Sequence, residues 1–372
     1  MFRNKIEVNW QLFKETSHTP SLIDIVGERN FKKVTDFCFI ENPYFPSKKT
    51  IKKLVKKLPE VIKKYPSGNP TIVQQHLASV ISADSEHLIL GNGATELITV
   101  IQNRLVKTMG IPVPTFSEYI EKVQSEDKVR LFPLSEEKSF QLDLNEYADW
   151  LNNERLTSAL VINPGNPTGQ LFSVAEMKAF LEKMRHLDLV LVDESFIDFS
   201  ENRIPTLIPF VKQFTNLLIV RSMSKHCGVP GLRLGYCCTA NTAFLKTIRG
   251  NLPVWNLNTL AEYFLAQLKD MEDEYHIARK KVIADIELLY QQLSQIEGFI
   301  VYPTGSNFIL MKVNFGTTAY EVQKMLLEEH GVYVRDCTNK EGLDQYHIRV
   351  ASQGRKKDKL LIGALKRIVA AR

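Results

Sequence analysis

The segment "RSMSKHCGVPGLRLGY", residues 221–236, gathers side chains that could hold an anion and react with a carbonyl group. Lys225 stands directly after the apolar run "LLIVRS" (217–222), so we expect its amine at the end of a β-strand, projecting into a cleft. The two serines and the two arginines of the same segment add hydroxyl and guanidinium donors. Because a single lysine at a strand end usually faces solvent, its role depends on what other segments place beside it.

Two further motifs contain glycine next to predicted secondary structure. "GNGATEL" (91–97) places Gly93 immediately before a predicted helix that starts with Ala94 and Thr95. Free backbone N–H groups at a helix N-terminus form an anion site, and glycine allows a close approach because it lacks a Cβ atom. "NPGNPTG" (163–169), which contains Asn166, follows the apolar run "SALVIN" and is either a ligand contact or simply a rigid turn.

Charged side chains mark the ends or interiors of other predicted strands. "VDESF" (192–196) ends an apolar run with Asp193, which either caps a following helix or, if buried, needs a cationic partner. "VRDC" and "HIRV" place Arg335 and Arg349 in strand patterns near the C-terminus. A buried guanidinium usually means a bound anion or a carboxylate partner.

The elements that must position these residues follow an alternating pattern. Short apolar runs alternate with amphipathic helical stretches up to about residue 257, which predicts an α/β fold with a mostly parallel sheet covered on both faces. A long helical pattern from Leu260 to about Gln295 follows, and then four strand-like runs interleaved with two helices. "VTDFCFIENP" (34–43) predicts a strand and a turn that pack against this later region.

These patterns predict two domains. We expect a large domain at residues 42–257, and a smaller α+β domain with a linking helix made from residues 1–41 and 258–372. A ligand site is expected where the carboxyl ends of the large sheet's strands meet the small domain.

In this chain order, "GNGATEL", "NPGNPTG", "VDES" and "SMSKHCGVPGLRLGY" resemble the fold-type I pyridoxal-phosphate enzymes. The likeness is to the branch that contains histidinol-phosphate aminotransferase and threonine-phosphate decarboxylase, and it runs from "IENP" near residue 41 to the C-terminal helix. It implies a fold-type I transferase with a seven-stranded sheet in the large domain, and pyridoxal 5'-phosphate as cofactor.

The resemblance also implies a role for each motif. Lys225 would form the Schiff base with the cofactor aldehyde and later carry protons, and Asp193 would pair with the protonated pyridine nitrogen. Asn166 would donate to the ring oxygen, and Phe116 of "PTFSEY" would lie over the ring face. The implied ligands of the cofactor phosphate are Gly93, Ala94, Thr95, Ser222, Ser224 and Arg233.

Tyr65 of "KKYPSG" matches the family tyrosine that reaches the phosphate of a neighbouring subunit. The resemblance therefore implies a homodimer with shared active sites. The alternative is a turn tyrosine before Pro66.

Position 196 bears on the type of reaction. Aminotransferases of this branch usually place a tyrosine there that donates to the ring oxygen, whereas this chain has Phe196 in "DESFIDF", as threonine-phosphate decarboxylases do. The substitution is either linked to decarboxylation or a packing change without effect on the reaction. Arg335, Arg349 and His18 of "TSHTPS" could form a cradle for a phosphoryl group.

The leading hypothesis is a pyridoxal-phosphate-dependent decarboxylase of a phosphorylated amino acid such as O-phosphothreonine or O-phosphoserine. The alternative enzyme is an aminotransferase that takes histidinol phosphate or another phosphorylated substrate, with glutamate as amino donor. A third possibility is a ligand sensor of the same fold fused to a DNA-binding domain, but the residues before position 41 have no basic helix-turn-helix pattern.

Composition narrows the classes of partner and compartment. The 372 residues are 44% hydrophobic and 24% charged with a net charge of +5, and the lysines of "KKTIKKLVKK" (48–57) have the spacing of a solvated helix face rather than of a nucleic-acid site. Five cysteines lack the spacing of a metal site or a disulfide framework. We find neither an apolar leader nor a run of about 18 apolar residues. We therefore expect a cytoplasmic enzyme without metal, membrane or nucleic-acid partner.

Overall fold

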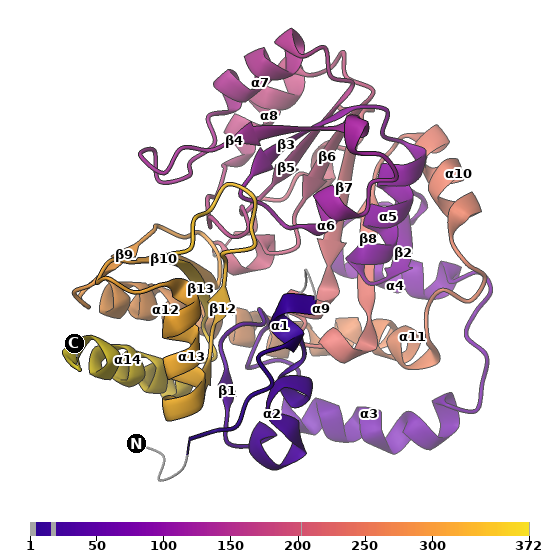
Figure 1. Cartoon of the computed structure of the whole chain (residues 1–372). Helices are drawn as coiled ribbons and strands as arrows, with labels where there is room; N and C mark the ends of the chain where they lie inside the picture. Colours follow the sequence, from indigo (N-terminus) through magenta and orange to yellow (C-terminus); the bar gives the residue numbers. More distant parts are fainter. Residues whose placement is uncertain (1–4, 16–19, 202, 372) are drawn as a thin grey trace.

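The computed structural model describes residues 5–15, 20–201 and 203–371, and its main feature is a seven-stranded sheet (Figure 1). All strands run parallel except β8, which is antiparallel to both neighbours. The mostly parallel large sheet predicted from the sequence is confirmed. In spatial order the strands are β2 (Leu88–Asn92), β8 (Leu234–Cys238), β7 (Leu217–Ser222), β6 (Leu189–Asp193), β5 (Ser158–Ile162), β3 (Met109–Val113) and β4 (Val129–Pro133).

Helices cover both faces of this sheet. Alternate residues of β6 point to opposite faces, so Leu189 and Leu191 pack in one apolar cluster while Val190 and Val192 pack in the other. Burial on both sides explains the continuous apolar runs in the sequence. One face carries α5 (Ala94–Arg104), α6 (Glu118–Glu121) and α10 (Thr242–Asn251); the other carries α4 (Thr71–Ile81), α7 (Leu144–Asn153), α8 (Val174–Lys183) and α11 (Thr259–Ala266).

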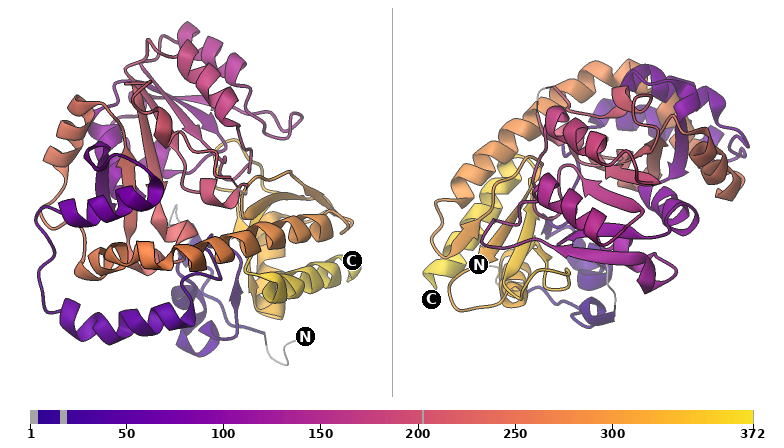
Figure 2. Two further views of the ribbon diagram at one scale, coloured as in Figure 1. Left: turned by 180° about the vertical axis from the view of Figure 1, so that it is seen from behind. Right: turned by 90° about the horizontal axis from the view of Figure 1, so that it is seen from above.

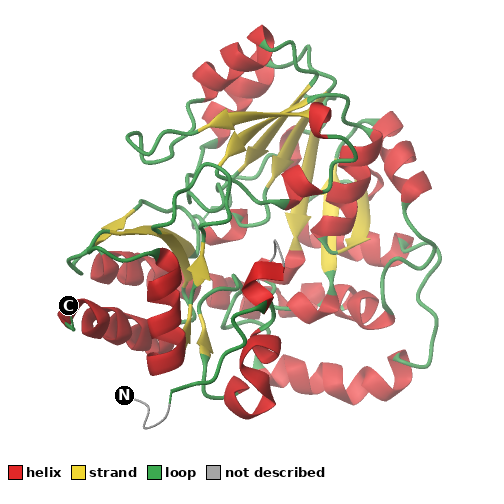
Figure 3. Ribbon diagram, in the orientation of Figure 1, coloured by secondary structure: helices red, strands yellow, loops and turns green. Residues whose placement is uncertain are grey.

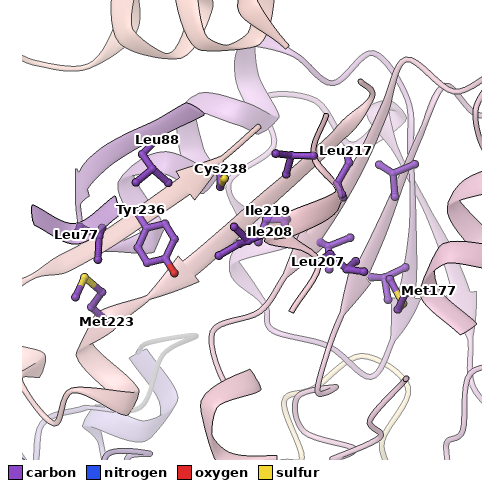
Figure 4. Packing of buried hydrophobic residues seen from close by; sticks show 14 of the residues in the cluster. Leu77, Leu88, Met177, Leu207, Ile208, Leu217, Ile219, Met223, Tyr236 and Cys238 are labelled. Carbon is purple, nitrogen blue, oxygen red and sulfur yellow. The ribbon is translucent and has the colours of Figure 1, made fainter. Parts of the chain in front are cut away.

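Figure 4 shows the packing on the second of these faces. Leu217 and Ile219 of β7 lie in the same cluster as Tyr236 of β8, and Leu77 of α4 and Met177 of α8 close it from the helix side. All five side chains are almost completely buried. This core fixes the strands whose ends carry the predicted site residues.

A second, antiparallel sheet lies beside the first, with helices packed against it (Figure 3). Its apolar side faces these helices in one buried cluster, so it forms a core of its own. Its strands are β12 (Arg335–Asp336), β13 (His347–Ala351), β10 (Phe308–Val313) and β9 (Phe299–Val301), and its helices are α12 (Glu272–Leu293), α13 (Ala319–His330) and α14 (Arg355–Ala370). The boundaries predicted at residues 41/42 and 257/258 stay a prediction.

The N-terminal region packs against this second sheet, as the sequence indicated. It contains α1 (Leu12–Glu15), α2 (Leu22–Phe31) and β1 (Thr35–Asp36). β1 pairs in parallel with β11 (Val332–Tyr333), and this pairing holds the turn after Asp36 beside the strand ends of the large sheet.

The prediction of a single long helix from Leu260 to about Gln295 is wrong. The chain forms α11, then a 3-10 turn at Leu268–Met271, and then α12. Three acidic residues, Glu272 to Glu274, occupy the first turn of α12, where negative charge favours a new helix N-terminus. α12 then crosses the back of the molecule from the large sheet to the small one (Figure 2).

The remaining helices are α3 (Lys48–Val61) and the single turn α9 (Met223–His226), with short 3-10 turns at Ser85–His87, Glu126–Lys128, Ile197–Phe199, Ile208–Phe210 and Pro230–Leu232. The lysines of α3 are exposed, in line with the solvated face expected from the sequence. All five cysteines are buried free thiols. Across the described residues, every helix is too short or too polar to pass through a bilayer.

Candidate active site

A cavity of about 350 Å³ lies at the carboxyl ends of the large sheet's strands, facing the small sheet. Most of the side chains predicted from sequence line it. They are Ala94, Thr95, Phe116, Asn166, Asp193, Phe196, Ser222, Ser224, Lys225, Arg233, Arg335 and Arg349.

Parallel pairing explains why distant segments meet here. Asp193 ends β6, Ser222 ends β7 and Asn166 follows β5, and the carboxyl ends of neighbouring parallel strands lie at one edge of a sheet. The backbone N–H of Ser222 donates to the Oγ atom of Ser195 at 3.0 Å, which ties the two strand ends together.

Lys225 lies on α9, the single helical turn directly after β7. The backbone N–H of Asn42 donates to the carbonyl of Lys225 at 3.0 Å, so the turn is fixed from the N-terminal side. The pKa of Lys225 is lowered to about 8, chiefly by loss of solvent and then by the positive charges of Arg349 and Arg233, against opposing effects of Glu41 and Asp193. A substantial fraction of this amine is therefore neutral, and nucleophilic, near neutral pH.

Asp193 lies at the floor of the cavity and is only 4% exposed. Its Oδ1 atom accepts from the backbone N–H of Ser195 at 2.8 Å, and its Oδ2 atom accepts from the Tyr119 hydroxyl at 2.9 Å. Burial raises the pKa of the carboxyl, because among the described residues no cation lies within ion-pair distance of it. A cationic ligand atom in the cavity would supply the missing partner.

The start of α5 faces the same cavity and forms an anion cradle. Gly93 precedes the helix with a φ of +82°, and no side chain caps the free N–H groups of the first turn. A Cβ atom at Gly93 would lie 2.4 Å from the guanidinium of Arg233, so the motif needs glycine to let that arginine approach. Arg233 itself has a φ of +54°, an unfavourable conformation that places its charge beside the helix N-terminus and Ser224.

The small sheet contributes two arginines to the opposite wall. Arg335 of β12 and Arg349 of β13 are register partners, so two positive side chains stand directly opposite each other. Arg349 donates to Asn166 Oδ1 and to the Cys38 carbonyl, both at 2.8 Å, while its Nε atom is buried without an acceptor. Arg335 donates to Asn339 Oδ1 at 2.7 Å.

Neither arginine has a carboxylate within ion-pair distance in the described part of the chain. Of the two alternatives that the sequence left open for these guanidinium groups, this geometry favours a bound anion over a carboxylate partner.

Comparison with known proteins agrees with this arrangement. A sequence model of the family described as aminotransferase class I and II matches residues 32–362. The chain belongs to the class I and II aminotransferase family. The L-serine phosphate decarboxylase of Campylobacter jejuni is 33% identical to this family member over 352 residues, 91% of this chain and 89% of that protein. A histidinol-phosphate aminotransferase of Methanosphaera stadtmanae is 29% identical and covers 88% of this chain and 89% of that protein.

Among solved structures, a decarboxylase from Sulfurospirillum multivorans superposes with a TM-score of 0.86 at 30% identity, over 95% of this chain and 92% of that one. The resemblance inferred from the motifs and the fold-type I architecture are confirmed, and the chain is an enzyme of this superfamily. The family is pyridoxal-phosphate-dependent and includes both decarboxylases and aminotransferases.

The residues of this class I and II family member fit that cofactor. The uncapped start of α5 with Arg233, Ser222 and Ser224 suits a phosphate group, and Asp193 lacks the cation that a protonated ring nitrogen would supply. Phe116 and Phe196 line the cavity between these points. Phe196 packs edge-on against Phe308, with ring centroids 5.1 Å apart, and it has no hydroxyl to donate.

The structure places two predicted residues, Gly93 and Tyr65, outside the cavity lining. Gly93 lies just behind the cavity wall, where its role is to admit Arg233. Tyr65 is 82% exposed, stacks on Trp255 and does not reach the cavity of its own chain. His18 lies outside the described residues.

Sequence reasoning missed other residues of the site. Tyr119 donates to Asp193 and lies three residues after Phe116 in "PTFSEY". On a helix this spacing puts two side chains on the same face, so it could have indicated that Tyr119 faces the same cavity as Phe116. Ser195 follows Asp193 within "VDES" and binds both Asp193 and Ser222. Lys340 lines the cavity from an irregular loop, and no periodic pattern in the sequence indicated it.

Proposed function

We propose that this protein is a pyridoxal-phosphate-dependent decarboxylase of a phosphorylated amino acid, with O-phospho-L-serine or O-phospho-L-threonine as substrate. The observation that carries the proposal is the pair of facing arginines, which have no carboxylate partner in the described part of the chain, opposite a lysine and a carboxylate suited to the cofactor. The similarity to an L-serine phosphate decarboxylase supports the same substrate class.

When bound, pyridoxal phosphate supplies an aldehyde that reacts with amines and a cationic ring that accepts electrons released at the substrate Cα atom. Lys225 would hold it covalently and Asp193 would keep its ring nitrogen protonated. Ala94, Thr95, Ser222, Ser224 and Arg233 would hold its phosphate, and Asn166 would donate to its ring oxygen. Phe116 would cover one ring face, where stacking contributes about 0.5–1.5 kcal/mol beyond burial.

Binding of the substrate's phosphoryl group by Arg335 and Arg349 would decide which bond breaks. The bond that breaks is the one that stands perpendicular to the ring, because only there do its electrons overlap the ring's π system. If the arginines hold the phosphoryl group, the carboxylate is free to take that position. The Cα–carboxylate bond would then be the one that breaks with loss of carbon dioxide, and the Lys225 ammonium would deliver a proton to Cα.

Phe196 supports decarboxylation over transamination. A tyrosine at this position would donate a hydrogen bond worth about 1–3 kcal/mol to an anionic ring oxygen, and the ring of Phe196 cannot. The second candidate, transamination of histidinol phosphate or another phosphorylated compound with glutamate, rests on the similarity to a histidinol-phosphate aminotransferase.

One experiment separates the two candidates. The holoenzyme is incubated with O-phospho-L-serine or O-phospho-L-threonine, and carbon dioxide and the phosphorylated amine are measured. Decarboxylation predicts equal amounts of both products and no reaction with glutamate. Formation of a keto acid, with conversion of the cofactor to its pyridoxamine form by glutamate alone, would identify an aminotransferase instead.

The assembly that we propose is a homodimer with shared sites. Apolar side chains are exposed on and after α3 and beside Tyr65, and exposed apolar surface of this kind often marks an interaction site. They are Ile51, Val55 and Leu58 of α3, Ile62 directly after it, and Val254 and Trp255. Mixing a Lys225→Ala variant with a Tyr65→Ala variant would regain activity if Tyr65 completes the partner's site, because one of the two sites in a mixed dimer is intact. The buried free thiols fit a reducing, cytoplasmic location.

A further inference from the structure

The loop between β12 and β13 brings a third cation to the small-sheet wall of the cavity. It reaches from the small sheet toward the large one (Figure 1), and its residue Lys340 lines the cavity together with Arg335 and Arg349. No role follows for Lys340 from the family motifs, because it lies outside them.

Contacts with the large domain fix the position of this lysine. Its Nζ atom donates to the Ser117 Oγ atom at 2.6 Å and lies 5.9 Å from the ring centroid of Phe116. Two residues later, Gly342 has a φ of +86° and packs against the backbone of Pro114, where a Cβ atom would lie 3.1 Å from the proline nitrogen. The loop therefore rests on the segment that carries Phe116, and it holds Lys340 at the cavity rather than in solvent.

Lys340 has unused hydrogen-bonding capacity. An ammonium group has three N–H donors, and in the described part of the chain only Ser117 accepts from it. No carboxylate lies within ion-pair distance of it there. Arg349 beside it also has an unused donor, since its Nε atom is buried without an acceptor.

Burial beside two other cations lowers the pKa of Lys340. Its pKa is lowered to about 8, chiefly by loss of solvent and then by the charges of Arg335 and Arg349, against opposing effects of Cys337 and Glu121. Three mutually repelling cations, none of which has a carboxylate at ion-pair distance among the described residues, form a site that gains most from a ligand with two negative charges.

We propose that Lys340 determines substrate specificity by completing, with Arg335 and Arg349, a three-cation site that selects a dianionic phosphoryl group over a carboxylate. This inference rests on the proposed function. A carboxylate has one charge and two oxygens, which one arginine fork satisfies, so Lys340 would stay unpaired. A phosphoryl group has three terminal oxygens and close to two charges, and it can accept from all three cations at once.

The test compares Lys340→Gln and Lys340→Arg holoenzymes with the unchanged protein, and uses Lys359→Gln on the exposed face of α14 as matched control. The Lys340→Gln change is expected to raise KM for O-phospho-L-serine about 10- to 100-fold, the effect of one charge-assisted hydrogen bond, with a smaller change in kcat. Competitive inhibition by L-glutamate, a carboxylate of similar length, should change less than about threefold. Lys340→Arg should restore most of the KM, and the control should match the unchanged protein.

Calorimetry with inorganic phosphate keeps this test separate from the proposed function. At pH 8 about half of the Lys340 side chains are neutral, so phosphate binding to the unchanged holoenzyme should take up roughly half a proton per site, and Lys340→Gln should abolish this uptake. If the unchanged protein takes up this proton but releases no carbon dioxide, the proposed decarboxylase activity is refuted while the proposed phosphate site is supported. Equal losses for O-phosphoserine and glutamate in Lys340→Gln, or an unchanged KM, would overturn the role of Lys340.

Discussion

The two walls of the cavity are built on different principles. On the large-sheet wall both signs of charge are present, and hydrogen bonds from Ser195 and Tyr119 hold Asp193 in place. On the small-sheet wall, the three cations Arg335, Lys340 and Arg349 face the cavity without an acidic partner among the described residues. The large-sheet wall thus combines charges of both signs, whereas the small-sheet wall would be stabilised by an anion that the described residues do not supply.

This difference predicts that variants of the two walls should affect different kinetic constants. Changes on the large-sheet wall should reduce kcat for every substrate, because that wall would hold the cofactor. Changes on the small-sheet wall should act mainly on KM and should depend on the charge of the substrate.

The largest effect is expected for Lys225→Ala. Without the amine there is neither covalent attachment nor a proton donor at Cα, so decarboxylation of O-phosphoserine should fall by at least about 100- to 10,000-fold. Borohydride reduction followed by mass spectrometry should find no attached cofactor, while Lys359→Ala retains it. More than a tenth of the original activity in Lys225→Ala would break the assignment of this wall to the cofactor.

Asp193→Asn should have the next largest effect. The amide cannot balance a protonated ring nitrogen, so kcat should fall about 100- to 1,000-fold, as for other lost groups that stabilise charge in a transition state. The variant should still fold, since an amide is less costly to bury than a carboxylate whose pKa burial raises. Steady-state kinetics and a thermal unfolding scan measure the two effects. A fall in unfolding temperature that parallels the loss of activity would point to a structural role instead.

Arg349→Gln tests the second wall. Removal of one guanidinium should raise KM for O-phosphoserine about 10- to 100-fold and change kcat much less. The matched comparison is Arg355→Gln, because Arg355 is an exposed arginine at the start of α14. If kcat falls while KM stays constant, the contrast between the two walls is incorrect.

The sequence predicted the large-sheet wall better than the small-sheet wall, for a physical reason. Asp193, Ser222 and Lys225 follow apolar runs, and parallel pairing brings the ends of such runs together whatever the details of packing. Lys340 lies in an irregular loop whose position depends on Ser117 and Pro114, more than 200 residues away, and no local pattern encodes that contact. The break between α11 and α12 escaped prediction similarly, since both segments are good helix formers.

The pH dependence of cofactor uptake links the two walls. The pKa of Lys225 is lowered to about 8 rather than 10.5, so roughly a quarter of its amine is neutral at pH 7.5, against about one in a thousand for an ordinary lysine. Uptake of pyridoxal phosphate by the apo-protein should therefore accelerate about tenfold between pH 7 and 9 and then level off. Absorbance in stopped-flow mixing follows this rate.

Two variants, one that removes a positive charge and one that removes a negative charge, test whether neighbouring charges shift the pKa of Lys225. The charge of Arg349 lowers the pKa of Lys225, so Arg349→Gln should move the midpoint to higher pH; Glu41 raises it, so Glu41→Gln should move the midpoint to lower pH. Shifts of the same sign in both variants would show that the electrostatic coupling across the cavity is not the cause.

The smallest effect is expected for Phe196→Tyr, which adds a donor to the large-sheet wall without changing any charge. Phe196 is 5% exposed and packs on Phe308, and a tyrosine hydroxyl would have to point into the cavity. A hydrogen bond to an anionic ring oxygen would stabilise that oxygen's deprotonated form by about 1–3 kcal/mol and lower the pH at which the holoenzyme spectrum changes. Because Arg335, Lys340 and Arg349 would still set the substrate's orientation, carbon dioxide release should fall less than tenfold and remain the main reaction. Conversion of the variant into an efficient aminotransferase would show that position 196, rather than the cations of the small-sheet wall, decides which bond at Cα breaks.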